Sequence, residues 1–211
     1  MNFEDKFKSA SINENALKSW TPEWLEAIKN GMLVRKDFDK GQMSRDMTVY
    51  VDDDNKAYLI HAAEDNLTLH ISELTDDYLD FTEKWTRVAP AGHNEAPAVF
   101  KKDGIYYMIT SGCTGWDPNE ARSFKSRSIW GPWQPLGNPC VGKEAELTFH
   151  SQSTFILPVE GKKDQFIFMA DRWKPDNPIE GSYVWLPIKI TDEKPILEWF
   201  DKWNLFDFKQ N

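Results

Sequence analysis

Three segments of this 211-residue chain repeat one pattern, and this repeat constrains the fold more than any other feature of the sequence. In each segment a polar residue precedes an apolar run, and an Asn or Gly follows nine positions after that polar residue. The three pairs are Asp46 and Asn55, Glu95 and Gly104, and Gln152 and Gly161. Asn and Gly tolerate the positive φ of a hairpin turn. Because a second apolar run follows each turn, each segment predicts a β-hairpin.

Each predicted hairpin is followed by two further strand-like segments. Third strands are expected at 68–72, 121–123 and 183–188, and fourth strands at about 78–87, 133–136 and 197–203. Four strands at a spacing of about 50 residues are typical of a β-propeller blade. A stack of hairpins in a β-sandwich is the alternative. The constant offset between the polar residue and the turn favours the propeller.

The N-terminal part of the chain has a different pattern. Thr21 is a suitable helix N-cap, Pro22 suits the first helical position, and Gly31 can end a short helix. We therefore expect residues 1–40 to form an N-terminal segment with a short helix, as a linker or the remnant of an earlier blade. Residues 41–211 are expected to form the β-propeller domain.

Composition narrows the classes of partner. The net charge of −9 disfavours nucleic acid, because phosphate backbones attract basic proteins. The sequence has no apolar run near the roughly 18 residues of a membrane span, and its first residues lack the apolar stretch of a signal peptide. As written, the chain is expected to be cytoplasmic and not bound to a membrane.

Aromatic residues are abundant, with 10 Trp, 13 Phe and 6 Tyr. Their flat apolar faces suit both packing in a β core and stacking on sugar rings. For any single Trp, core packing is the simpler interpretation. The high Trp content is therefore compatible with a carbohydrate site without requiring one.

The sequence gives little indication of a metal or a disulfide scaffold. The four histidines lack ligand spacing, and the Asp52–Asn55 run lacks the glycine and distal glutamate of an EF-hand, so it predicts an ordinary turn. No metal or cofactor is expected. Cys113 and Cys140 are either one disulfide or two thiols, and the sequence leaves that choice open.

Three polar residues are the candidate site. The innermost strand of each propeller blade lines a central channel, so Asp46, Glu95 and Gln152 are expected to point toward one axis. Two carboxyl groups converging in an aromatic-walled cleft suit glycoside hydrolysis, in which a protonated acid donates to the leaving oxygen. A nearby carboxylate raises the pKa of such an acid. The alternative is that all three are a solvated channel lining.

Several short strings resemble glycoside hydrolase family 43, and most closely its exo-β-1,3-galactanase branch. The strings are Gly41–Met47 (GQMSRDM), Asn94–Ala98 (NEAPA), Ser111–Trp116 (SGCTGW) and His150–Thr154 (HSQST). The resemblance extends in order over about residues 38–203. It implies an all-β, five-bladed propeller, of which this chain carries about three to four blades, and an inverting hydrolysis.

The same resemblance assigns roles to the three polar residues. Glu95 falls at the position of the general acid, and Asp46 at that of the residue that orients the acid and modulates its pKa. Gln152 falls where the galactanase branch holds the attacking water. Glutamine is a poor base, so it would act by positioning the water or through its imidic tautomer.

Four further residues are expected to bind the sugar by the same resemblance. Thr114 and Trp116 would contact the terminal sugar, while Trp173 and Tyr183 would shape the pocket. The expected activity is the exo-acting, inverting release of galactose from β-1,3-galactan. The alternatives are an α-L-arabinofuranosidase or other exo-glycosidase of the family, and a non-catalytic carbohydrate-binding propeller.

Three clear blade repeats are fewer than the five that the family uses, and the shortfall is expected to be N-terminal. The resemblance implies relatives that are secreted or periplasmic, and a truncation would remove an export signal as well. We therefore expect the isolated chain to have little or no activity on its saccharide substrate. Incomplete closure would leave a sheet face and edge exposed, and self-association is one way to cover them.

Overall fold

The computed structural model describes residues 44–205, except 65, 67 and 91. The helix predicted near residues 22–31 and the predicted domain boundary at 40/41 lie outside this range. The described residues form two compact units. The first comprises the described residues up to Pro97 together with Ser126–Gln134, and the second comprises Ala98–Lys125 with the described residues from Pro135 onward.

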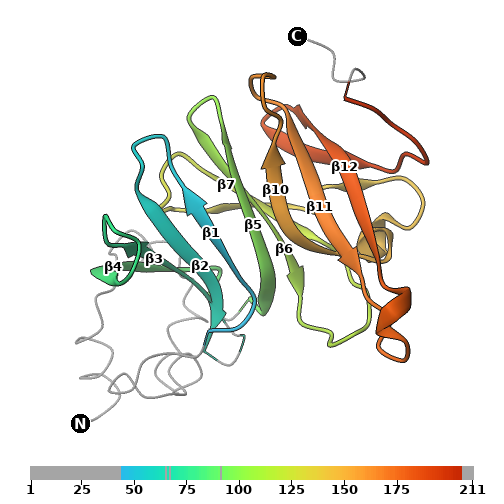
Figure 1. Cartoon of the computed structure of the whole chain (residues 1–211), viewed down its shortest axis with the longest axis horizontal. Helices are drawn as coiled ribbons and strands as arrows, with labels where there is room; N and C mark the ends of the chain where they lie inside the picture. The colour runs from blue at the N-terminus through green and yellow to red at the C-terminus, as the bar shows by residue number, and fades with distance from the viewer. Residues whose placement is uncertain (1–43, 65, 67, 91, 206–211) are drawn as a thin grey trace. The chain divides into compact units, whose positions relative to one another are not determined.

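The sheet of the first unit is a four-stranded antiparallel meander in the order β1-β2-β3-β4 (Figure 1). Its strands are β1 (Met47–Val51), β2 (Ala57–Ala63), β3 (Thr68–Leu74) and β4 (Phe81–Val88). Almost every side chain of β2 and β3 is buried, as expected for inner strands covered on both faces. Tyr58 of β2 packs edge-on against Trp130, with ring centroids 5.5 Å apart.

A second four-stranded sheet has the order β5-β6-β7-β8, and most of its residues belong to the second unit. Its strands are β5 (Asn94–Lys102), β6 (Ile105–Gly112), β7 (Arg122–Ser126) and β8 (Gln134–Gly137). Every residue of β6 is buried. Ile, Tyr, Met and Thr dominate this strand, and such residues pack well on a pleated, buried surface.

The third sheet has five strands in the order β10-β11-β12-β13-β9, and β10, β11 and β12 lie side by side in Figure 1. Its strands are β9 (Cys140–Val141), β10 (Gln152–Pro158), β11 (Phe166–Arg172), β12 (Ser182–Thr191) and β13 (Lys194–Glu198). Two 3₁₀ segments, η1 (Ala145–His150) and η2 (Pro178–Glu180), connect the strands. Within this sheet β9 pairs in parallel with β13, whereas the β10–β11, β11–β12 and β12–β13 pairs are antiparallel.

Aromatic rings join the second and third sheets into one core. Phe100 of β5 stacks on Tyr107 of β6 with centroids 5.0 Å apart, and lies 4.7 Å from the ring of Phe166 at the start of β11. Phe168 and Leu197 are fully buried in the same cluster. Much of the aromatic content of the second unit is therefore core, which agrees with the simpler interpretation of the composition.

The repeat predicted from the sequence is confirmed at all three hairpins. The turn residues Asn55, Gly104 and Gly161 have φ of 64°, 74° and 74°. Each lies between the first two strands of its sheet, as the nine-residue offset requires. The predicted all-β class is confirmed too, because three sheets of four or five strands account for the regular structure of the described chain apart from the two 3₁₀ segments.

Other details of the prediction need correction. The last strand was expected at 197–203, but β13 covers Lys194–Glu198, because Asp192 and Glu193 adopt positive φ and make a tight hairpin without glycine. The short parallel strand β9 was not predicted. Cys113 and Cys140, whose pairing the sequence left open, are not joined in a disulfide. Within the described residues, no helix has the length and apolar character needed to cross a bilayer.

The Asp52–Asn55 run forms the β1–β2 turn, as predicted. Oδ1 of Asp52 accepts from the backbone N–H of Asp53 at 2.8 Å, and Oδ1 of Asp54 accepts from that of Lys56 at 3.1 Å. Asn55 closes the turn by donating its own N–H to the carbonyl of Asp52 at 2.9 Å. These carboxylates therefore satisfy backbone donors of the turn.

Candidate functional site

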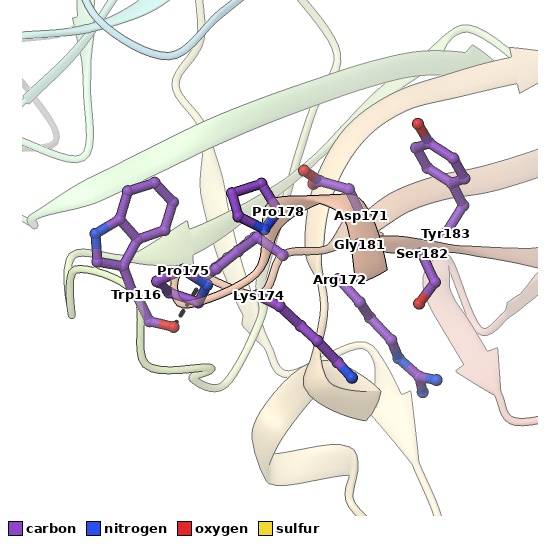
Figure 2. Close-up of a pocket in the computed structure, with 10 residues that line it drawn as sticks. Trp116, Asp171, Arg172, Lys174, Pro175, Pro178, Gly181, Ser182 and Tyr183 are labelled. Atoms are coloured by element: carbon purple, nitrogen blue, oxygen red, sulfur yellow. Dashed lines mark hydrogen bonds between the residues drawn. The ribbon is translucent and has the colours of Figure 1, made fainter.

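The second unit contains a pocket of about 480 Å³ at the ends of β11 and β12 (Figure 2). Its lining consists of Trp116, residues 171–175, Pro178 and residues 181–183. It therefore brings together three of the residues predicted to bind sugar, namely Trp116, Trp173 and Tyr183. Trp116 is 68% exposed and Tyr183 79% exposed, so their rings are available for stacking.

The two tryptophans of the pocket are joined directly. Nε1 of Trp173 donates to the backbone carbonyl of Trp116 at 2.8 Å, and the two rings meet edge-on with centroids 6.0 Å apart. Trp173 follows the end of β11, whereas Trp116 lies in the loop after β6. The hydrogen bond therefore fixes a loop residue to the end of a strand, which holds one aromatic wall of the pocket in place.

The loop that carries Trp116 is organised by Asn119. The side chain of Asn119 accepts from the N–H of Gly112 at 2.7 Å and donates to the carbonyl of Gly112 at 3.0 Å. It also donates to Oγ1 of Thr114 at 2.7 Å, and the Thr114 hydroxyl donates to the carbonyl of Asp117 at 2.6 Å. Thr114 is exposed in this loop, two residues before Trp116.

Gln152 is positioned beside the same pocket. It is the first residue of β10, is half-buried, and pairs across the sheet with Asp171, which lines the pocket. Its Nε2 donates to Oγ of the buried Ser111 at 2.6 Å. Because the amide nitrogen is the donor in this bond, the Oε1 atom of Gln152 is the acceptor atom of the side chain.

Glu95 and Asp46 lie in the first unit. Glu95 is the second residue of β5 and is half-buried, and its Oε2 accepts from Nδ2 of Asn66 at 3.4 Å. Asp46 directly precedes β1, its side chain is exposed, and its backbone carbonyl accepts from the N–H of Ala62 at 3.0 Å. The convergence of Asp46, Glu95 and Gln152 on one site stays a prediction.

A buried charged cluster in the first unit was missed by the sequence analysis. Oε1 of Glu64 lies 2.5 Å from Nε of Arg87 and 2.8 Å from Nε2 of His70, and all three side chains are buried. Burial by itself raises the pKa of Glu64, but the hydrogen bond from His70 and the charge of Arg87 hold it below its ordinary value. The three residues lie on different strands or turns, so no local spacing indicated the cluster.

Two histidines face each other across β2 and β3. His61 and His70 are paired in register, and their ring centroids are 5.5 Å apart. Burial, with a smaller contribution from the charge of His70, lowers the pKa of His61 to about 4. Burial lowers the pKa of His70 as well, against the opposing effect of the Glu64 carboxylate. Both rings are therefore neutral at pH 7, as buried imidazoles usually are.

Comparison with solved structures gives extensive similarity. The chain is 54% identical to a family 43 β-1,3-galactosidase solved with galactodeoxynojirimycin, with a TM-score of 0.83 over 97% of this chain and 60% of that one. It is 37% identical to an exo-β-1,3-galactanase from Clostridium thermocellum, with a TM-score of 0.68 over 79% of this chain and 37% of that one. An exo-β-1,3-galactanase from Phanerochaete chrysosporium solved with β-1,3-galactotriose is 31% identical, with a TM-score of 0.67 over 75% and 36%.

The chain thus spans about three fifths of the galactosidase and little more than a third of the two galactanases. A comparison with curated proteins finds no significant match. The family model for glycosyl hydrolases family 43 matches residues 18–192, which is most of the chain. These matches, together with the three sheets and their shared hairpin register, show that the chain belongs to glycoside hydrolase family 43.

Proposed function

We propose that this chain is an exo-acting hydrolase that releases galactose from the end of β-1,3-linked galactan with inversion at the anomeric carbon. The observation that carries the proposal is the position of Gln152 beside the aromatic pocket. Its register partner Asp171 lines that pocket, and its amide is held by Ser111, five residues before Trp116. The galactose-specific part of the proposal is supported by the names of the similar structures, which are galactosidases and galactanases.

In the proposed reaction, Glu95 is the general acid. It donates a proton to the glycosidic oxygen while the bond from that oxygen to the anomeric carbon breaks. A water held by Oε1 of Gln152 bonds to the anomeric carbon from the opposite face and loses a proton to solvent, and Glu95 is reprotonated from solvent. A single displacement of this kind inverts the configuration, and it needs roughly 6.5–9.5 Å between the acid and the group that holds the water.

Asp46 would orient the acid and modulate its pKa through its negative charge. Trp116, Trp173 and Tyr183 would contact the sugar, because aromatic faces stack on the apolar faces of pyranose rings. Thr114 would add a hydroxyl contact from the same loop as Trp116. We expect turnover by the 211-residue chain to be measurable but far below that of a full-length relative, because the chain covers 60% of the similar galactosidase.

The test is the release of galactose from β-1,3-galactobiose at high enzyme concentration, with the anomer of the first product read by proton NMR. Release above the background of Glu95→Gln, with α-galactose formed first, supports the proposal. Glu95→Gln should retain binding of galactodeoxynojirimycin in calorimetry. Release of arabinose from an α-L-arabinofuranoside instead would favour the other family activity. Binding without any hydrolysis by the unmodified chain would favour a carbohydrate-binding module.

A further inference from the structure

The turn directly before Gln152 has an unusual backbone. Thr148, Phe149 and His150 have φ of 51°, 54° and 59°, three successive left-handed residues without a glycine among them. A side chain with a Cβ atom disfavours this conformation, and such strain persists only where surrounding contacts impose it. Strained segments of this kind gather at functional sites. Because this turn directly precedes Gln152, the contacts that hold it also influence the position of that side chain.

Arg172 supplies the first of these contacts. Its Nε and Nη2 atoms both donate to the backbone carbonyl of Phe149, at 2.9 and 2.6 Å. The guanidinium lies 4.8 Å from the ring centroid of Trp199, and that ring lies 5.6 Å from the ring of Phe149. Two donors on one carbonyl, backed by stacking, fix both the position and the orientation of the peptide group.

The location of Arg172 connects this contact to Gln152. Arg172 is the last residue of β11 and follows Asp171, the register partner of Gln152. Asp171 and Arg172 extend in opposite directions from the strand in Figure 2. The strand end thus pairs with Gln152 through one residue and fixes the preceding turn through the next.

Thr148 supplies a second contact of the turn, with a different segment of the chain. Its hydroxyl donates to the backbone carbonyl of Asn119 at 2.7 Å. The side chain of Asn119 also organises the loop that carries Thr114, through the hydrogen bonds already described. The turn is therefore joined to β11 through Arg172 and to the Trp116 loop through Asn119, and Gln152 follows it by two residues.

We propose that Arg172 is a positioning residue that acts through Gln152. By holding the carbonyl of Phe149, it imposes the left-handed turn and so directs the Gln152 amide toward Ser111 and the pocket. The catalytic consequence rests on the proposed function, in which Gln152 holds the attacking water. Arg172 needs no contact with the reacting atoms in this role, because a shift of the turn would displace Gln152.

The positioning itself is testable without any activity, by NMR of the Gln152 side-chain amide in the 211-residue chain. The signal is assigned by its loss in Gln152→Ala. In Arg172→Met, we expect the two amide protons to move toward the shifts of a solvent-exposed glutamine. The matched control is Lys189→Met, which removes a cation 5.2 Å from the ring of Phe200 elsewhere in the same unit. An unchanged Gln152 signal in a folded Arg172→Met chain would overturn the proposal.

If Arg172→Met does not fold, Arg172→Lys decides the question. Lysine keeps a cation near Trp199 but cannot place the planar two-donor fork on one carbonyl. The same displacement of the Gln152 signal is expected with smaller amplitude, and an unchanged signal in this variant would count against the proposal.

Kinetics then test the link to catalysis. On β-1,3-galactobiose, Arg172→Met should lower kcat by about 10²-fold, the effect of misplacing a catalytic group by about 1 Å, with little change in KM. In a Gln152→Ala background the same substitution should have less than about a twofold effect, because residues that act as a unit are not additive. Equal effects in both backgrounds would overturn the proposal. If the unmodified chain hydrolyses no galactoside, the proposed function fails, and the NMR result alone decides the positioning.

Discussion

The side-chain amide of Asn66 donates a hydrogen bond to Oε2 of Glu95, with an N···O distance of 3.4 Å. Asn66 lies in the tight turn between β2 and β3 and has a φ of 64°. Glu64, two residues earlier in this turn, is buried in the cluster with His70 and Arg87. The contacts of Glu64 with His70 and Arg87 thus hold this turn in place. The same turn presents the Asn66 amide as a hydrogen-bond donor to the carboxyl group of Glu95, the proposed acid.

Asn66→Ala should therefore lower hydrolysis of β-1,3-galactobiose by about fivefold, since Glu95 is protonated as the acid and a hydrogen bond between neutral groups contributes about 1 kcal/mol. Thermal stability should change little, because Asn66 is only half-buried. Steady-state kinetics and thermal melts measure the two effects. The control is Gln134→Ala, which removes an exposed amide from β8. Equal kinetics in the two variants would contradict an orienting role for Asn66.

The hydrogen bond between Trp173 and Trp116 makes a separate prediction about ligand affinity. Trp173→Phe keeps an aromatic ring but removes the Nε1 donor to the Trp116 carbonyl, so the Trp116 loop should lose its attachment to β11. The Kd for galactodeoxynojirimycin should rise about fivefold, in line with a hydrogen bond of about 1 kcal/mol. Isothermal titration calorimetry gives this Kd.

Trp203→Phe is the matched control, because Nε1 of Trp203 makes the same kind of bond to the carbonyl of Trp185, at 2.7 Å, outside the pocket lining. Its effect on the Kd should be less than about twofold. Equal losses of affinity in both variants would indicate a general destabilisation.

The sequence indicated the parts of the fold that rest on local chemistry. Asn55, Gly104 and Gly161 were recognisable because only a few residue types suit a positive φ in a hairpin. The same reasoning failed at Asp192 and Glu193, and at Thr148–His150, because Glu, Thr and Phe rarely adopt left-handed backbone. In the turn before Gln152 the conformation is imposed by Arg172, 23 residues later in the chain, so no local signal could show it.

In the candidate site, too, contacts between residues far apart in the sequence could not be predicted from local patterns. The aromatic residues of the pocket were named by resemblance, and their meeting in one cavity depends on β6, β11 and β12 lying in one unit. The Glu64–Arg87–His70 cluster had no counterpart in the sequence analysis. Its members approach one another only through the register of β2, β3 and β4, and an isolated Glu or Arg is ordinarily a surface residue.

The two thiols should differ strongly in reactivity. Burial raises the pKa of Cys140 to about 12, whereas Cys113 is half-buried. At pH 8 the thiolate fraction of Cys140 is then about 10⁻⁴, and only thiolates react readily with disulfide reagents. Ellman's reagent should label one thiol quickly in the folded chain and the second only in denaturant. Cys113→Ser should abolish the fast phase and Cys140→Ser should preserve it, and the reverse pattern would contradict the assignment.

Acid should destabilise the first unit through its buried histidines. The pKa of His61 is about 4 in the folded chain, below its ordinary value of 6.5, so between these values the unfolded chain binds a proton that the folded chain does not. The stability is complete above pH 6.5 and is lost as the pH falls toward 4, by about 3 kcal/mol for a shift of this size. The lowered pKa of His70 acts in the same direction.

Urea titrations at pH 7, 6 and 5 measure this dependence as the free energy of unfolding. His61→Gln should be less stable than the unmodified chain at pH 7, because it disturbs a buried site, but its stability should fall less steeply with pH. The control His93→Gln changes an exposed histidine and should retain the full slope. If His61→Gln keeps the same slope as the unmodified chain, protonation of His61 is not the source of the acid sensitivity.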